Sequence, residues 1–326
     1  MLLRSARQLA TQPCTRILAD ILVRRPFDMS KCTSLARRRL SLILLASLAM
    51  ALSAMAPAMA QSLRVMSFNV RLPVESDGPN RWEARRQLAA DMLARERPDL
   101  IGTQELFQQQ GDELIALLPQ YAWFGRGRKG GGERDEHMGV LYRKDRLRVL
   151  QSGDFWLSDT PEVVGSITWG NLYPRMVTWA RFQRVADGAT FVLYNTHFPY
   201  RDEDEPVRER CAALIVARLR QLSPDEPVIL TGDFNTVPGS PTHALLTSTL
   251  KDAWTSAPRR HGPADTFHDF TGNADRRIDW VLYRGLRVKQ VRTVTTHGDG
   301  RYPSDHFPVV VDFTLPARKQ PKSPLR

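Results

Sequence analysis

The chain contains 326 residues, with 46 Lys or Arg and 35 Asp or Glu side chains, and its net charge is +11. The excess lies at the two ends, because residues 1–60 carry nine basic and two acidic side chains, and the ten residues after Pro316 carry four basic and no acidic ones. Residues 61–316 therefore hold 33 charges of each sign, which argues against the basic surface that duplex-binding proteins use.

Residues 1–60 have the pattern of an N-terminal leader with a signal peptide. Three arginines at Arg37–Arg39 precede an apolar run at Leu40–Leu52, and Ala58-Met59-Ala60 follows as a small-residue cleavage site. The run is short and rich in alanine, so we expect no stable membrane anchor. The general secretory route and the twin-arginine route both fit this pattern. The leader thus predicts a periplasmic or secreted protein.

After residue 60 the apolar pattern predicts many short strands and a few helices. Alternating or continuous apolar runs indicate strands at 63–68, 100–102, 137–142, 148–157, 176–182, 190–197, 228–231, 278–282, 288–295 and 307–313. Helical spacing and proline stops indicate helices at 80–97, around 114–118, at 206–222 and directly after Pro241. Residues 126–135 and 158–173 are expected as loops. This pattern indicates an α+β sandwich of two sheets in one domain.

Cys211 is the only cysteine after residue 60, so the chain without its leader can form no intrachain disulfide. Its neighbours Ala212, Ala213 and Leu214 are apolar and continue the predicted helix. We therefore expect Cys211 to be a small buried side chain and not a nucleophile.

Polar side chains stand at the ends of several predicted strands. Asparagine, acidic and histidine residues occupy such ends at Asn69, Glu105, His197, Asp233, Asn235 and Asp305. Each by itself is more often a turn residue than a ligand, but the strands of one sheet can bring their ends together at one edge. Oxygen donors in this number suit Mg²⁺ or Mn²⁺. A softer metal is disfavoured, because no cysteine pairs with a histidine and no H-E-x-x-H motif occurs.

Six motifs carry a family resemblance, and they span nearly all of residues 63–314. They are Ser67-Phe68-Asn69-Val70, Gln104-Glu105, Asn195-Thr196-His197, Gly232-Asp233-Phe234-Asn235, Arg277-Ile278-Asp279 and Ser304-Asp305-His306. In these motifs the chain resembles the endonuclease/exonuclease/phosphatase superfamily, which includes pancreatic deoxyribonuclease, abasic-site endonucleases, neutral sphingomyelinases and inositol-polyphosphate 5-phosphatases. It is most similar to a bacterial secreted branch. The resemblance implies a four-layer α/β/β/α sandwich of two packed mixed sheets over residues 61–316, followed by a basic tail at 317–326.

The resemblance also implies roles for the residues at the strand ends. Glu105 resembles the principal carboxylate ligand of Mg²⁺, with Mn²⁺ as the alternative, and Asn69 and Asp305 would help to hold the metal or its water molecules. Asp233 resembles the residue that orients or activates the attacking water. Asn235 resembles the amide that contacts the phosphate.

The two histidines at strand ends receive different roles. His306 resembles a histidine held by a carboxylate, here Asp279, which would fix its tautomer and favour its charged form. His197 resembles the second histidine of the deoxyribonuclease and sphingomyelinase branches, which the abasic-site branch lacks. Glu136 stands where a carboxylate partner for His197 is expected, although other acidic residues lie in the same loop.

Two further residues are candidates for substrate contacts. Arg175 matches a basic residue of the bacterial secreted branch, where it would contact the phosphate. A salt bridge at the start of a strand is an equally ordinary role for it. His268 lies in Thr266-Phe267-His268-Asp269-Phe270, between two motifs, and we expect it to face the substrate.

Together these features predict an exported, divalent-metal-dependent phosphoester hydrolase, either a phosphodiesterase or a phosphatase. A water molecule would attack phosphorus in line. Because residues 61–316 are neutral, we expect a small molecule or a lipid head group as substrate in preference to duplex nucleic acid. We expect the protein to be a monomer. The alternatives are a secreted nuclease acting on DNA or RNA, whose affinity for DNA would fall steeply with salt, and a relative that binds a ligand without turnover.

The cleavage site gives a direct prediction. Because Ala58-Met59-Ala60 follows the apolar run, the mature protein should begin at Gln61. N-terminal sequencing of protein recovered from the periplasm or the medium measures this. Stable cytoplasmic protein with an intact leader would contradict it.

Overall fold

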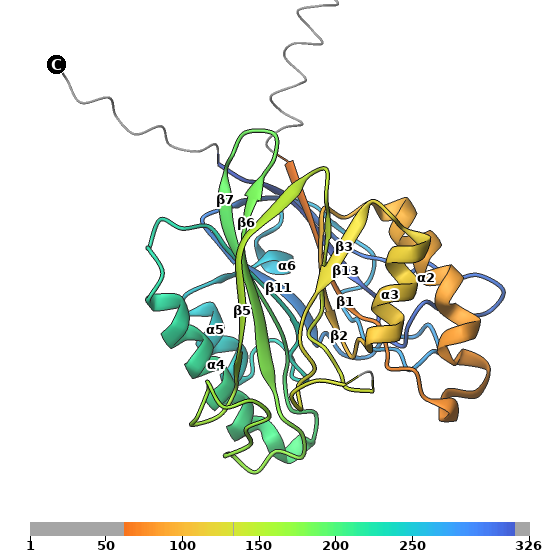
Figure 1. Ribbon diagram of the computed structural model, residues 1–326, viewed down its shortest axis with the longest axis horizontal. Helices are drawn as coiled ribbons and strands as arrows, with labels where there is room; N and C mark the ends of the chain where they lie inside the picture. The colour runs from red at the N-terminus through yellow and green to blue at the C-terminus, as the bar shows by residue number, and fades with distance from the viewer. Residues whose placement is uncertain (1–61, 133, 317–326) are drawn as a thin grey trace, which may run out of the picture. The chain divides into compact units, whose positions relative to one another are not determined.

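The computed structural model describes residues 62–132 and 134–316 (Figure 1). The leader with its cleavage site and the basic tail lie outside the described residues. Within them, many strands are apolar on both faces, as in β1 (Ser62–Asn69), where Val65 joins one apolar core and Met66 another. A strand that is apolar on both faces must be packed against other elements on both sides. The sheets and helices therefore stack in layers.

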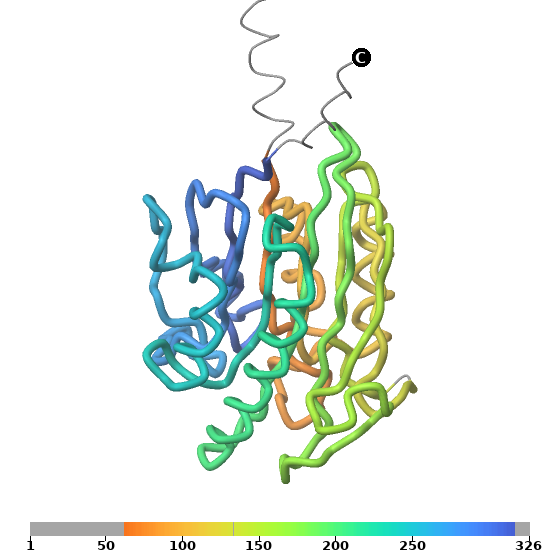
Figure 2. Tube along the Cα trace, turned by 90° about the vertical axis from the view of Figure 1, so that its left-hand side faces the viewer, coloured from red at the N-terminus to blue at the C-terminus, as the bar shows by residue number. Residues whose placement is uncertain are grey.

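One layer is a seven-stranded mixed sheet that contains both ends of the described chain. Its order is β10-β12-β13-β1-β2-β4-β3. β1 runs parallel to β2 (Leu100–Gln104) and antiparallel to β13 (Val309–Thr314), which lies beside it (Figure 2). The other members are β3 (Tyr121–Phe124), β4 (Val140–Arg143), β10 (Arg260–His261) and β12 (Arg287–Thr293).

A second, six-stranded mixed sheet packs against the first. Its order is β5-β6-β7-β8-β11-β9. β7 (Thr190–His197) runs parallel to β8 (Val228–Asp233), and β11 (Asp279–Arg284) runs antiparallel to β8. The remaining strands are β5 (Leu147–Trp156), β6 (Met176–Arg184) and β9 (Lys251–Asp252).

Helices cover the outer face of each sheet. α2 (Trp82–Glu96) and α3 (Gln108–Leu117) pack on the seven-stranded sheet, and α4 (Glu205–Arg220) and α5 (Pro241–Thr247) pack on the six-stranded one (Figure 1). Shorter helical segments are η1 (Glu75–Asn80), η2 (Asp202–Asp204) and α6 (Ala253–Ser256). The predicted four-layer α/β/β/α sandwich of two mixed sheets is thereby confirmed.

Cys211 lies on α4 and is fully buried between this helix and the six-stranded sheet, as its neighbours predicted. Burial raises the pKa of its thiol, which disfavours the reactive thiolate. No helix among the described residues is long and apolar enough to cross a membrane.

The two sheets approach most tightly where β2 lacks a side chain, at Gly102. A Cβ atom there would lie 2.0 Å from Thr231 Oγ1 and 2.5 Å from Asn195 Oδ1. Asn195 Nδ2 donates across the interface to the carbonyl oxygen of Thr103 at 2.7 Å, and Asn195 Oδ1 accepts from Gln104 Nε2 at 2.8 Å and from Thr231 Oγ1 at 2.9 Å. One buried amide therefore bonds to both sheets, and the missing Cβ makes room for it.

Substitution of Gly102 tests this close approach. Gly102→Ala should lower the free energy of unfolding by about 1–3 kcal/mol, because the added methyl group would force Thr231 and Asn195 apart. Urea denaturation measures the change. Gly298→Ala is the matched control, since its added Cβ would meet only the end of the Leu88 side chain, at 3.3 Å. Equal effects of the two substitutions would contradict the proposed role of Gly102.

Candidate active site

The strand ends that carry the sequence motifs meet at one cavity of about 550 Å³. Register pairs place them together, since Asp233 lies opposite both His197 and Asp279 in the six-stranded sheet. The predicted site residues that line the cavity are Glu105, Glu136, Arg175, His197, Asp233, Asn235, Asp305 and His306. Asn69 and Asp279 are buried and bond to lining residues.

Asn69 connects the acidic residues of the two sheets. Its Nδ2 donates to Glu105 Oε1 at 3.1 Å, from the end of β2, and to Asp233 Oδ2 at 3.0 Å, from the end of β8. Glu105 itself has φ of 59°, in the left-handed region that a side chain rarely adopts. A strained backbone conformation of this kind is often kept where a side chain must reach a functional site.

Asp305 and Glu105 form an acidic pair close to Arg71 and within electrostatic reach of Arg85. Asp305 Oδ2 lies 3.6 Å from Arg71 Nη1, while the Nε and Nη2 atoms of Arg71 are bonded to Asp77. Burial raises the pKa of the Asp305 carboxyl, the charge of His306 opposes this, and the Glu105 carboxylate adds to it.

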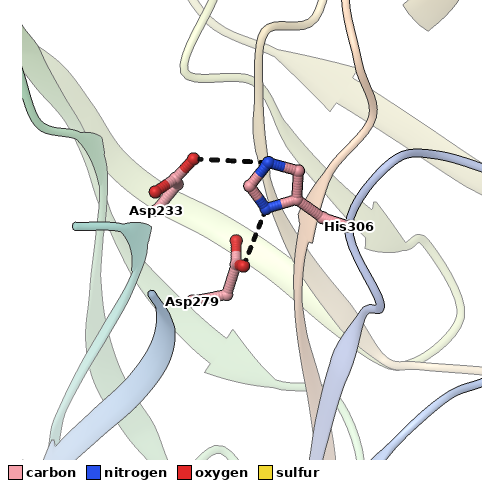
Figure 3. A group of neighbouring side chains, drawn as sticks. All are labelled: Asp233, Asp279 and His306. Carbon is pink, nitrogen blue, oxygen red and sulfur yellow. Dashed lines mark hydrogen bonds and ion pairs between the residues drawn. The ribbon is translucent and has the colours of Figure 1, made fainter. Parts of the chain in front are cut away.

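Two groups of side chains near the cavity are candidates for holding a metal. Asp233, Asp279 and His306 have ligand atoms within 4.8 Å of one another (Figure 3). However, Asp279 and His306 are bonded to each other, and a charged imidazole has no lone pair for a metal. Asn69, Glu105 and Asp305 offer oxygen donors, two of them carboxylates, and they fit a divalent cation better.

His306 is held in its charged form. Its Nδ1 lies 2.8 Å from Asp279 Oδ2, and its Nε2 lies 3.9 Å from Asp233 Oδ2 (Figure 3). Burial lowers the pKa of His306, but the carboxylates of Asp279, Asp305 and Asp233 together outweigh burial and raise that pKa to about 10, with Asp279 contributing most. The Asp279–His306 pair expected from the resemblance is therefore present.

Asp233 lies between both histidines. Its Oδ1 accepts from the backbone N–H of Asn235 at 3.0 Å, and its Oδ2 is 3.6 Å from His197 Nε2. Burial, reinforced by the Asp279 carboxylate, raises the pKa of Asp233 to about 7, while His306 opposes the shift. A carboxylate with a pKa near neutrality is suited to accept a proton from water.

The expected pair between Glu136 and His197 is not formed. Glu136 accepts a hydrogen bond from Arg128, and His197 Nδ1 has no partner among the described residues. Burial, followed by the charges of Arg175 and Arg128, keeps the pKa of His197 well below its usual value. A buried carboxylate prefers a permanently charged arginine to a neutral imidazole, which explains the exchange of partners.

Of the two residues expected to contact substrate, only Arg175 lines the cavity. Its side chain is buried and forms no ion pair with a described residue, so the alternative of a salt bridge is not seen. His268 lies behind the cavity wall, where its ring stacks on Phe307 with centroids 4.0 Å apart. The expectation that His268 faces the substrate is therefore wrong, and its neighbour Phe267 lines the cavity instead.

Arg85 on α2 is a buried positioning residue that the motifs did not indicate. Its guanidinium donates to the carbonyl oxygens of Val70 and Arg71, after Asn69, and to that of Pro303 at 2.9 Å, before Asp305. It thus joins the two loops that carry the candidate metal residues. The sequence did indicate that Arg85 is buried, because it shares the apolar face of its helix with Trp82 and Ala89.

Comparisons with known proteins agree with this geometry. Residues 66–306 match the sequence model of the Endonuclease/Exonuclease/phosphatase family. The chain belongs to this family. Its structure is similar to that of a family member from Bacteroides vulgatus, with 32% identity, a TM-score of 0.74, and coverage of 78% of this chain and 99% of that one. A mannosyl-6-phosphatase from Bacteroides thetaiotaomicron is 31% identical, with a TM-score of 0.72 and coverage of 78% of this chain and all of that one.

More distant relatives share part of their length with the chain. The uncharacterized protein L388 of Acanthamoeba polyphaga mimivirus is 30% identical over 179 residues, which make up 53% of this chain and 64% of the relative. The chain spans 45% of the Drosophila melanogaster protein angel, at 27% identity over 169 residues, or 49% of this chain. Family members hydrolyse phosphoesters, and this chain carries a buried cluster of two aspartates and a histidine.

The charge of His306 can be tested by titration. Asp279→Asn removes the anion that raises the pKa of His306 and leaves burial, which lowers it. The pKa should fall by about 1–3 units, and the alkaline limit of activity should move to lower pH with it. NMR titration of the imidazole measures the shift directly. An unchanged titration of His306 would contradict this account.

Proposed function

We propose that the protein is an exported, Mg²⁺-dependent hydrolase of phosphoesters on small molecules. The observation that carries the proposal is the position of Asp233. This carboxylate lies between one charged and one neutral histidine and is bonded through Asn69 to Glu105, at the wall of a cavity. Such an arrangement provides a proton acceptor, a cation and oxygen ligands around one point.

Asp233 would accept a proton from the attacking water. The backbone N–H of Asn235 and the side chain of Asn69 orient its carboxylate. Asn235 lines the cavity, and its backbone has φ of 50°. Its side-chain Nδ2 donates a hydrogen bond to the carbonyl oxygen of Phe198 at 3.0 Å, which holds the amide in place. In this position Asn235 can contact a phosphate oxygen.

The histidines would contribute in different charge states. His306 is cationic, so its Nε2–H can donate to a phosphate oxygen and stabilise the charge that develops there. His197 is neutral, so it can exchange a proton with Asp233 or donate one hydrogen bond. Both act on the same phosphoryl group, so the effects of removing them should not be additive.

Glu105, Asp305 and Asn69 would hold the divalent cation. When bound there, Mg²⁺ supplies positive charge that stabilises the phosphate oxygens and the leaving group. The oxygen-only donors favour Mg²⁺ or Mn²⁺ over softer metals. Arg71 lies close to Asp305 and supplies part of the positive charge that this cluster requires.

Two observations support a small substrate. Residues 61–316 carry no net charge, whereas duplex-binding enzymes need a basic surface. The similar mannosyl-6-phosphatase is covered over its whole length by this chain. Export to the periplasm or medium follows from the leader pattern, and a monomer is sufficient for this site because one chain supplies all of its residues.

A metal-supplemented screen tests the proposal. With Mg²⁺, the protein should hydrolyse at least one ester among phosphomonoesters, phosphodiesters, sphingomyelin and plasmid DNA, and EDTA should abolish the activity. Glu105→Gln should lower the rate about 100-fold or more, which corresponds to about 2.7 kcal/mol of barrier, with little change in the folding midpoint.

Glu83→Gln is the matched control for the loss of one carboxylate. Glu83 is exposed on α2, so its removal should leave the rate unchanged. Full activity in EDTA would refute the metal-dependent mechanism. No hydrolysis of any of these esters with Mg²⁺ or Mn²⁺ would refute the proposed function.

A further inference from the structure

Two arginines in the cavity wall are buried without enough hydrogen-bond partners. Arg128 and Arg175 line the cavity and are only 4% and 3% exposed. Buried arginines are normally paired at their donor groups. Here Arg128 Nε, Arg128 Nη1 and Arg175 Nη1 have no partner among the described residues.

Only one of these two arginines forms an ion pair with a described residue. Glu136 accepts from Arg128 Nη2, whereas Arg175 forms no ion pair within the described part of the chain. Burial lowers the pKa of Arg175 to about 10, and the Arg128 charge contributes to this, so Arg175 still carries its proton at neutral pH. Glu136 is therefore the one described carboxylate in direct contact with the pair, and the donor atoms that lack partners can bind an added anion.

The neighbours of Arg128 hold it in place. Its Cζ lies 4.7 Å from the centroid of the Tyr173 ring, and Tyr173 stacks with Tyr200 at 6.5 Å. Tyr173 and Glu136 thus occupy one face and one edge of the guanidinium, and both residues line the cavity with it. The N–H groups of Arg128 that lack partners are therefore held in fixed positions. Donors held in place in this way bind an oxyanion strongly.

The pair also lies within electrostatic reach of the reacting groups. Both arginines lower the pKa of His197, and Asp233 and Glu105 act on Arg175. A ligand bound to them would therefore lie beside the proposed point of water attack. An anion at this point is surrounded by the arginine pair, His306 and the candidate metal residues.

We propose that Arg128 and Arg175 form a subsite for the non-bridging oxygens of a terminal phosphate dianion, so that the enzyme selects phosphomonoesters over phosphodiesters. This inference rests on the proposed function and names its substrate class. A phosphomonoester carries a charge of about −1.5 to −2 at pH 7, whereas a diester carries a single charge. Guanidinium groups match the oxygens of a phosphate in pairs, which a lysine does not.

A matched pair of substrates tests the selection. p-Nitrophenyl phosphate and its methyl ester share a leaving group and differ by one methyl group and one charge. With Mg²⁺ the wild-type protein should prefer the monoester. Arg175→Met should lower kcat/KM about 100-fold on the monoester and less than about 10-fold on the methyl ester. Arg175→Lys, which keeps the charge and loses the paired donors, should fall between Arg175→Met and wild type.

Two variants separate this effect from general damage. Arg81→Met removes an exposed arginine that pairs with Glu83 and does not line the cavity, and it should change neither substrate's kinetics. Arg128→Met leaves Glu136 buried without its cation, which threatens folding. The double variant Arg128→Met/Glu136→Gln removes both charges together and should keep the fold while losing the monoester preference.

Binding of inorganic phosphate, measured by calorimetry, tests the subsite without turnover. Phosphate affinity should fall in Arg175→Met and in the double variant but not in Arg81→Met. Unchanged phosphate affinity, equal losses on the two esters, or a wild-type preference for the methyl ester would overturn the inference and leave the proposed function standing. If the protein hydrolyses neither ester, that result counts against the proposed function. The phosphate titration would still test the subsite separately.

Discussion

The buried amide of Asn195 is the contact on which the arrangement of the site depends. The site is assembled from two different sheets, so the distance and register between them determine whether its parts meet. Asn195 accepts and donates hydrogen bonds across that interface, and the missing side chain of Gly102 allows the approach. With the sheets held in this way, the short Asn69 side chain can bond to carboxylates on both of them.

Burial acts alike on the two histidines of the cavity, but their neighbours differ. His306 faces the Asp279 carboxylate and is kept charged, whereas His197 faces the arginine pair and is kept neutral. Asp233 lies within 4 Å of both rings. The difference in charge between the two rings therefore arises from the groups beside them, because the imidazoles themselves are identical.

Most of the layered fold and the cluster of strand ends could be predicted, because both depend on local apolar patterns and on motifs that close individual strands. β3 (Tyr121–Phe124) was missed, since a strand of only four residues carries too little pattern. The partner of Glu136 was also missed. Its choice of Arg128 depends on how the glycine-rich loop folds back, and no spacing encodes that. His268 was misplaced because adjacent residues of an irregular loop can point to opposite sides, and Phe267 faces the cavity.

The burial of Cys211 has a practical consequence for observing this enzyme in solution. In a chain that begins at Gln61 it is the sole cysteine, and it lies beneath α4 with no exposed surface. Thiol reagents would therefore react selectively with a single cysteine introduced at the rim of the cavity, for example in place of the half-exposed Tyr200. A fluorophore attached there could report ligand arrival in real time, without first removing the native thiol.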